Sequence, residues 1–279
     1  MDGETAERIP LRGGRGVPAH ATLLVFWLLG GILLAFVLLP LIALGATQTV
    51  ASLARIAQDV EVTDALALSL AAAFVTAVIA GLFGVPLAYL LARGQFWGKG
   101  ILAAIVDLPL AVPHTVAGIA LLMVFGRRGL IGGAAEALFG LKFWGSFAGI
   151  VVAMLFVAAP FTVNAARIGF EAVDPRLEMV ARTLGMGPWK TLLRVTLPLA
   201  WRGIATGLTL TYARSISEFG AVIIIAYYPM TAPVEIYDLF LRFGLNEAAG
   251  MSVLLLLVAL GLFAVFRVLA YGNPKWGER

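Results

Sequence analysis

The chain has 279 residues, of which 61% are hydrophobic and 13% charged, and its mean hydropathy is +0.97. Soluble domains are typically about 45–50% apolar and about 25% charged, so this composition excludes an ordinary soluble protein and indicates one embedded in lipid. The absence of cysteine excludes disulfides and thiolate metal sites, two histidines are too few for a histidine-rich metal centre, and the net charge of +4 is first a guide to orientation in the membrane.

Apolar runs follow one another along the chain. Residues 1–20 are polar and rich in Arg, Gly and Pro, and we expect a disordered cytoplasmic arm there. Residues 21–272 contain runs close to the ~20 residues that a spanning helix requires. We predict six spans, at about 22–46, 65–92, 100–125, 145–168, 201–226 and 250–271. The first run exceeds the roughly 7–15-residue core of a signal peptide, so we expect it to be retained. Residues 273–279 would form a short cytoplasmic tail.

The basic residues set the orientation. With both termini inside, 14 of the 20 Lys and Arg residues lie in inside segments, five lie outside, and Arg214 lies within a span. This excess agrees with the positive-inside rule. Composition and charge therefore predict an all-α integral membrane protein with six transmembrane helices and cytoplasmic N and C termini.

Several enzymatic motifs are absent from the sequence. It contains no G-x-x-x-x-G-K-[ST] nucleotide-binding loop, no H-E-x-x-H and no G-x-S-x-G. We therefore expect no catalytic residues, no metal site and no bound cofactor on this chain. If the protein is a pump, a partner or an ion gradient must supply the energy.

The stretch at about 171–200, between the fourth and fifth predicted spans, is charged and compatible with helix. Gly185 would end a first short helix, and Pro188 suits the first turn of a second one. Leu184 and Trp189 are apolar side chains in a cytoplasmic loop, which is typical of a docking surface. An ordinary helical connector explains the same residues equally well.

This stretch resembles the coupling loop of permease subunits of importer-type ATP-binding-cassette (ABC) transporters. The family pattern is E-A-A, three residues, Gly, nine residues and I-x-L-P. Here 179–181 takes the E-A-A place, Gly185 the glycine, and 195–198 the end; Met179 departs from the family's glutamate, and Glu178 stands one residue earlier. The resemblance implies that the loop inserts into a cleft of the ATPase subunit, with these residues involved: Glu178, Met179, Ala181, Arg182, Leu184, Gly185, Pro188, Trp189 and Pro198.

A second resemblance concerns the fifth predicted span. Residues 213–221 (ARSISEFGA) are similar to the A-[RK]-x-[LI]-[GS]-E-F-G-A stretch of sulfate and molybdate/tungstate permeases, and residues 226–233 and 108–113 resemble the molybdate/tungstate group. The resemblance implies a type I ABC importer permease in the cell (inner) membrane. It also implies a permease homodimer, two ATPase subunits that hold ATP and Mg, and an extracytoplasmic oxyanion-binding protein, with no nucleic acid involved.

Two charged residues are predicted inside the fifth span. Arg214 lies 13 residues from Trp201, about 20 Å along a helix and near the middle of a ~30 Å core. Glu218 lies four residues further, on the same helix face. Because a lone charge is costly there, we expect a structural Arg214–Glu218 pair; alternatively, Arg214 also attracts a passing dianion.

Polar residues near these charges are candidates for the translocation path. Pro109 and Pro113 can kink or break the third span, and the polar groups freed there can line a cavity. The candidate path residues are Thr115, Arg214, Ser217 and Glu218. We do not expect His114, beside the break, to bind a metal. Asp107, near the start of this span, is expected to be a helix-packing or capping residue.

The spacings Gly145-x-x-x-Gly149 and Gly203-x-x-x-Gly207 permit close helix contact, within one chain or between two copies.

Outside loops carry seven acids against five bases, which favours delivery by a binding protein over capture of a free dianion. The amphipathic stretch within 227–249 would lie on the membrane or form part of a platform for that protein.

These patterns predict a permease that imports molybdate or tungstate by alternating access. The alternatives are sulfate, phosphate or ferric-ion import by the same machinery, and an ion-coupled carrier, for which we see no matching inverted repeat. An intramembrane enzyme would need paired catalytic groups, and Asp107 is the only aspartate predicted within a span.

Overall fold

The computed structural model describes the backbone of residues 19–271 and the side chains of residues 23–265. The predicted tail at 273–279 and nearly all of the predicted arm at 1–20 lie outside the described residues. Within the described part, the secondary structure consists of helices and their connections, without strands. The chain divides into two units, residues 1–47 and 48–279, which are described separately.

The first unit contains one long helix, α1 (Ala19–Ala46). Its most apolar window has a mean hydropathy of 2.7, and none of that window is buried inside the protein. A helix that is apolar on all sides requires a nonpolar environment around it. The first predicted span is therefore a helix long and apolar enough to cross a membrane.

The second unit contains the remaining helices, which follow local start signals. The carboxylate of Asp59 and the hydroxyl of Ser146 cap two long helices, and Asp174 caps a short one in which Pro175 occupies the first turn. The helices are α2 (Val50–Ile56), α3 (Val60–Arg93), α4 (Lys99–Ala111), α5 (His114–Phe125), α6 (Leu130–Phe139), α7 (Phe147–Glu171), α8 (Pro175–Thr183), α9 (Pro188–Thr191), α10 (Leu197–Ile216), α11 (Val222–Ile225), α12 (Ala232–Phe243) and α13 (Leu245–Tyr271).

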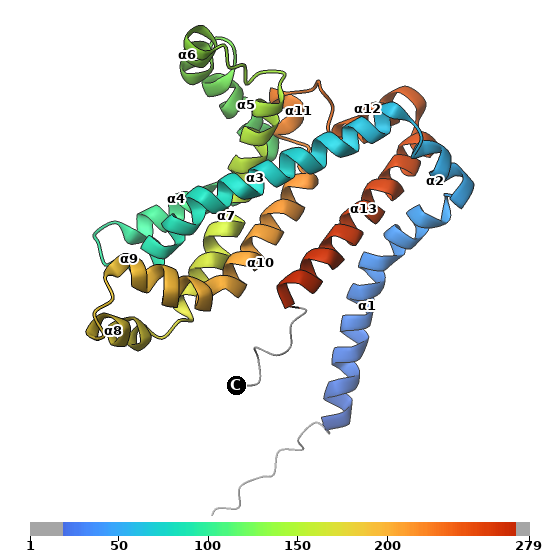
Figure 1. Ribbon diagram of the computed structural model, residues 1–279. Helices are drawn as coiled ribbons and strands as arrows, with labels where there is room; N and C mark the ends of the chain where they lie inside the picture. The colour runs from blue at the N-terminus through green and yellow to red at the C-terminus, as the bar shows by residue number, and fades with distance from the viewer. Residues whose placement is uncertain (1–18, 272–279) are drawn as a thin grey trace, which may run out of the picture. The chain divides into compact units, whose positions relative to one another are not determined.

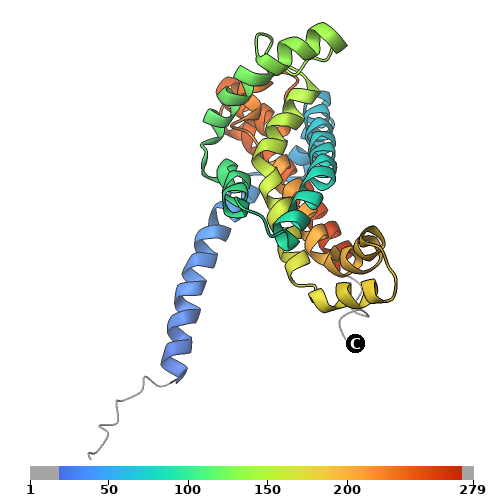
Figure 2. The ribbon, with the colours of Figure 1, turned by 90° about the vertical axis from the view of Figure 1, so that its left-hand side faces the viewer.

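Helices α3, α7 and α10 contact one another and form the centre of this unit (Figures 1 and 2). Helices α8 and α9 lie beside the C-terminal end of α3, and α12 lies beside its N-terminal end (Figure 1). We call these the α8 end and the α12 end. The loop before α7 belongs to the α12 end, because the Gly145 amide donates a hydrogen bond at 3.1 Å to the carbonyl of Ile225, the last residue of α11, and Gly145 lies against the Tyr228 carbonyl in the loop that leads to α12.

Small residues bring the central helices close together. An added Cβ at Gly203 of α10 would lie 2.6 Å from the Cα of Gly169 on α7. The hydroxyls of Thr162 and Thr211 are 2.6 Å apart, and Thr211 also donates to the Ala158 carbonyl at 3.0 Å. Close backbone approach and buried hydroxyl pairs are both common between membrane helices. The Gly203 spacing noted in the sequence thus serves packing within this chain.

Some of the predicted spans correspond to single long helices, and others do not. By length and composition, α3, α7 and α13 can each cross a membrane, as can α1. The third predicted span, 100–125, is instead a pair, α4 and α5, bent by 111° at Val112–Pro113. The fifth prediction, a continuous helix over 201–226, is wrong, since α10 starts earlier and ends at Ile216 before the turn that leads to α11. Hydropathy registers an apolar run but not a break within it.

The close contact of α7 and α10 can be tested by adding one methyl group. We expect Gly203→Ala to lower the melting temperature of the purified protein, because the new Cβ meets backbone that cannot rotate away; overpacking of this kind costs about 1–3 kcal/mol. The matched control is Gly261→Ala on α13, where an added Cβ has no neighbour within 4 Å. The control should be neutral or slightly stabilising. Equal melting temperatures for the two variants would contradict this account of the packing.

Candidate functional site

A cluster of three charged or titratable side chains lies where three helices begin or end. The carboxylate of Glu218, only 1% exposed, accepts hydrogen bonds from Arg214 Nη2 at 2.7 Å and from His114 Nδ1 at 2.8 Å. It also accepts one from the backbone amide of Ala221 at 2.9 Å. A buried carboxylate is tolerated only when it is paired and hydrogen-bonded, and these donors meet that requirement.

The cluster joins residues at the ends of three helical segments. Arg214 lies in the last turn of α10, His114 is the first residue of α5, and Ala221 immediately precedes α11. Non-helical backbone at membrane depth is tolerated only where its polar groups find partners. Glu218 supplies such a partner and binds the three segments together.

The structure brings together most of the residues proposed for the translocation path. Ser217 Oγ accepts a hydrogen bond from Arg214 Nη1 at 3.3 Å and donates one to the Arg214 carbonyl at 3.0 Å. Thr115 follows His114 on α5 and is exposed. The side chain of Arg214 is 24% exposed and that of His114 is 42% exposed, so both groups are accessible while Glu218 is buried beneath them.

Sequence reasoning missed the part that His114 plays. From the sequence we expect His114 to lie beside the helix break and not to bind a metal, and a contact with a carboxylate is not predicted. Its partner, Glu218, lies 104 positions away in the chain. The available signal was its position directly after Pro113, at a predicted helix break. Asp107, meanwhile, packs helices together, because its Oδ1 accepts a hydrogen bond from Asn164 Nδ2 at 2.6 Å.

The stretch at 171–200 forms two short helices joined by a left-handed turn. Gly185 has a φ of +86°, a conformation that L side chains rarely adopt, and α9 begins at Pro188 as expected. From Pro188 the chain is helical through α9, one π-helical turn (Leu192–Thr196) and α10. Pro198 therefore lies inside a continuous helical segment that ends at Ile216, next to the Glu218 cluster.

Glu178 faces the protein and not the surface. It is 6% exposed, and its Oε1 accepts a hydrogen bond from Arg93 Nε at 3.0 Å. The same guanidinium donates to the Val173 carbonyl at 2.7 Å. These contacts attach α8 to the last turn of α3, so Glu178 serves as an anchor rather than as an outward contact. Ala181, 5% exposed, lies on the same inner side.

The outer side of this stretch is apolar. Leu184 is 77% exposed, Trp189 75% and Met179 56%, and Arg182 is exposed beside them. We call Met179, Leu184 and Trp189 the docking surface. Exposed apolar side chains gathered at the polar end of a bundle are typical of a protein-binding site.

The sequence of this chain matches a protein family and several known proteins. Residues 84–277 match the family described as binding-protein-dependent transport system inner membrane component. The molybdate/tungstate transport system permease protein WtpB of Thermococcus kodakarensis is 45% identical over 248 residues, which cover 88% of this chain and 95% of that one. The probable sulfate transport system permease protein of Chlorella vulgaris is 33% identical over 226 residues, covering 80% and 84%.

Among solved structures, a bacterial alginate ABC transporter in complex with an alginate pentasaccharide-bound periplasmic protein contains a similar chain. Its TM-score is 0.73 at 17% identity, covering 90% of this chain and 95% of that one. At this identity the similarity shows the fold alone.

The intramembrane cluster can be tested by removing its charges in order. Arg214→Met should destabilise the protein by about 3–5 kcal/mol, because it leaves the buried Glu218 carboxylate without its main partner. Adding Glu218→Gln should recover most of the loss, since the amide oxygen can still accept from Ala221. Thermal unfolding followed by intrinsic fluorescence measures both variants.

The matched control is Arg167→Met, which breaks the exposed Arg167–Glu171 pair of the same i,i+4 spacing. It should cost only about 0.3–0.5 kcal/mol. A double variant no more stable than Arg214→Met would show that the pair is not the stabilising element.

Proposed function

Because the chain belongs to the family of binding-protein-dependent transport system inner membrane components, we propose that it is the permease subunit of an ABC importer for molybdate or tungstate. It would carry the oxyanion inward by alternating access, driven by ATP hydrolysis on a partner subunit. The observation that carries this proposal is the 45% identity to a relative named for molybdate/tungstate transport, over nearly the full length of both chains. Sulfate import is the second candidate, supported by the 33% identity to the sulfate permease relative.

The partners follow from the same proposal. Two copies of the permease would assemble with two ATPase subunits, which hold ATP and Mg, and with an extracytoplasmic binding protein. The complex of the alginate transporter with a periplasmic protein supports an assembly of this kind. The excess of Lys and Arg in the segments at the α8 end supports a cytoplasmic position for that end.

The docking surface would transmit the movement of the ATPase subunits. Its apolar side chains would enter a cleft on the ATPase, while Glu178 on the inner side holds α8 to Arg93 on α3. A displacement of α9 would pass along the continuous helical segment from Pro188 to the Glu218 cluster. The docking surface would thus be connected to the helices around the path in two ways, through the Glu178–Arg93 pair and through the helical segment that begins at Pro188.

The Glu218 cluster would contact the anion during its passage. Arg214 and His114 are partly exposed and offer hydrogen-bond donors, while the buried carboxylate offsets their positive charge. Conduction requires binding that is favourable enough for entry and weak enough for release. A partly neutralised arginine suits that requirement better than an isolated one.

The substrate and the energy source can be tested together. In nanodiscs, the complex of this chain with its ATPase should hydrolyse ATP faster when the binding protein is loaded with molybdate or tungstate than when it is empty. Greater stimulation of ATP hydrolysis by the sulfate-loaded binding protein would favour sulfate import. The absence of a co-purifying ATPase, or of any response to a loaded binding protein, would contradict the proposal and favour an ion-coupled carrier.

The docking surface can be tested with two substitutions. Leu184→Ser together with Trp189→Ser should weaken assembly with the ATPase about tenfold or more, because buried aromatic anchors dominate such interfaces. The permease itself should stay folded, since both side chains are exposed. The matched control is Trp97→Ser, which alters a 95% exposed tryptophan in the α3–α4 loop at the same end. Pull-down of the ATPase measures assembly, and retained assembly of the double variant would refute the docking role.

A further inference from the structure

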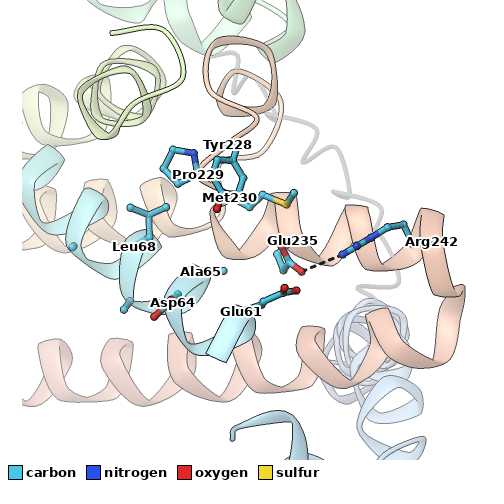
Figure 3. A pocket seen from close by; sticks show the side chains of 11 residues that line it. Glu61, Asp64, Ala65, Leu68, Tyr228, Pro229, Met230, Glu235 and Arg242 are labelled. Carbon is cyan, nitrogen blue, oxygen red and sulfur yellow. Dashed lines mark ion pairs between the residues drawn. The ribbon is translucent and has the colours of Figure 1, made fainter. Parts of the chain in front are cut away.

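An acidic pocket opens at the α12 end (Figure 3). It has a volume of about 620 Å³ and is lined by Glu61 and Asp64 from α3, by Glu235 and Arg242 from α12, and by the loop that contains Tyr228. Glu61 and Asp64 are exposed, and Tyr228 is 72% exposed. The pocket is therefore accessible from outside the bundle.

The charges in and beside this pocket are not balanced. Among the described residues that line the pocket, Arg242 is the one base, beside the carboxylates of Glu61, Asp64 and Glu235 and of the adjacent Asp238. Arg242 is engaged mainly by Asp238, whose Oδ2 lies 2.5 Å from its Nε, and its Nη2 is 4.0 Å from Glu235 Oε1. Within the described part of the chain, Glu61 and Asp64 form no ion pair.

Glu235 is the residue that indicates a missing partner. It is 6% exposed, and its Oε1 makes no hydrogen bond with any described residue. Figure 3 shows its carboxyl group directed into the pocket, toward that of Glu61. Burial, together with the negative charge of Asp238, raises the pKa of the Glu235 carboxyl above its usual value. A buried acceptor without a donor is costly, and a cation entering the pocket would relieve that cost.

We propose that this pocket receives a Lys or Arg side chain of the extracytoplasmic binding protein when that protein docks. The proposal rests on the function proposed above and adds the chemistry of one contact. The carboxylates would pair with the cationic head, and Leu68, Met230 and the ring of Tyr228 would contact its aliphatic stem. A bare metal ion is disfavoured, because no three of the described His, Asp and Glu residues are placed so that they could hold one together.

A second charged region favours a protein over a small cation as the partner. Arg127 and Arg128, in the α5–α6 loop, are exposed and form no ion pair with any described residue. Lys142, which lies 3.8 Å from the carboxylate of Glu136, and Trp144 line a hollow beside Arg127, so three bases stand there against one acid. The same end thus carries an acidic pocket on one element and a basic region on another. A partner protein that carries basic residues opposite the acidic pocket and acidic residues opposite the basic region would complement both. Charge complementarity of this kind fixes the orientation of the partner and speeds its association.

The test uses the complex in nanodiscs and the purified binding protein loaded with molybdate. Glu61→Gln with Asp64→Asn should raise the Kd of the binding protein about tenfold, which corresponds to about 1.4 kcal/mol, and should make the Kd less sensitive to salt. Both residues are exposed, so their replacement leaves the core intact. The matched control is Glu247→Gln, an exposed acid of α13 at the same end, which should leave the Kd unchanged. An unaltered Kd for the double variant would overturn the proposal.

Charge exchange identifies the occupant. Glu61→Lys should abolish docking, and one Lys→Glu or Arg→Glu variant of the binding protein should restore it. If instead the pocket variants change only the stabilisation of the protein by phosphatidylethanolamine nanodiscs relative to phosphatidylcholine nanodiscs, the occupant is a lipid amine and the proposal fails. A wild-type complex that responds to no loaded binding protein refutes the proposed function as well. If the wild-type complex responds to the loaded binding protein and the pocket variants bind it with the same Kd, only the proposal for the pocket is refuted.

Discussion

The buried carboxylate of Glu218 joins helix ends that must find hydrogen-bond partners within the protein. Helix α10 stops at Ile216, and α5 starts at His114 after a 111° bend. Lipid offers polar groups at such breaks no hydrogen bonds, so the protein must supply them. Glu218 accepts from the side chains of Arg214 and His114 and from the Ala221 amide. One carboxylate therefore holds the end of α10, the start of α5 and the start of α11 together, and Arg214 balances its charge.

The two ends of the bundle differ in the chemistry of their surfaces. At the α8 end, the charged residues Arg93 and Glu178 are used internally to hold α8, and apolar side chains face outward. At the α12 end, apolar side chains such as Ile236 and Leu239 pack inward, and charges remain around an open pocket. The first surface suits a stable partner that buries apolar area. The second suits a partner that arrives and leaves, because charge complementarity acts mainly on the rate and orientation of association.

One helical segment connects the α8 end to the Glu218 cluster. The segment from Pro188 to Ile216 is helical throughout, and small residues such as Gly203 hold it against α7 at backbone contact. Packed helices of this kind move as bodies and do not bend continuously. In the proposed transporter, movement of the α8 end would pass along this segment to the Glu218 cluster.

The sequence by itself determined the features that depend on neighbouring residues. Hydropathy located the long apolar helices α1, α3, α7 and α13, because the apolarity that places a helix in lipid belongs to a contiguous run. Local spacing identified the i,i+4 relation of Arg214 to Glu218, the turn at Gly185 and the start of α9 at Pro188.

Only the tertiary structure decided the contacts between distant segments. His114 and Glu218 are 104 positions apart, and Arg93 and Glu178 are 85 apart. Neither pair has a local pattern, because each exists only where two helices happen to meet. The resemblance to the coupling loop implies that Glu178 takes part in the contact with the ATPase subunit, whereas in the structure Glu178 packs against α3 and pairs with Arg93. The end of α10 at Ile216 could not be read from hydropathy either, because apolar residues continue into α11 and no apolar run records a break.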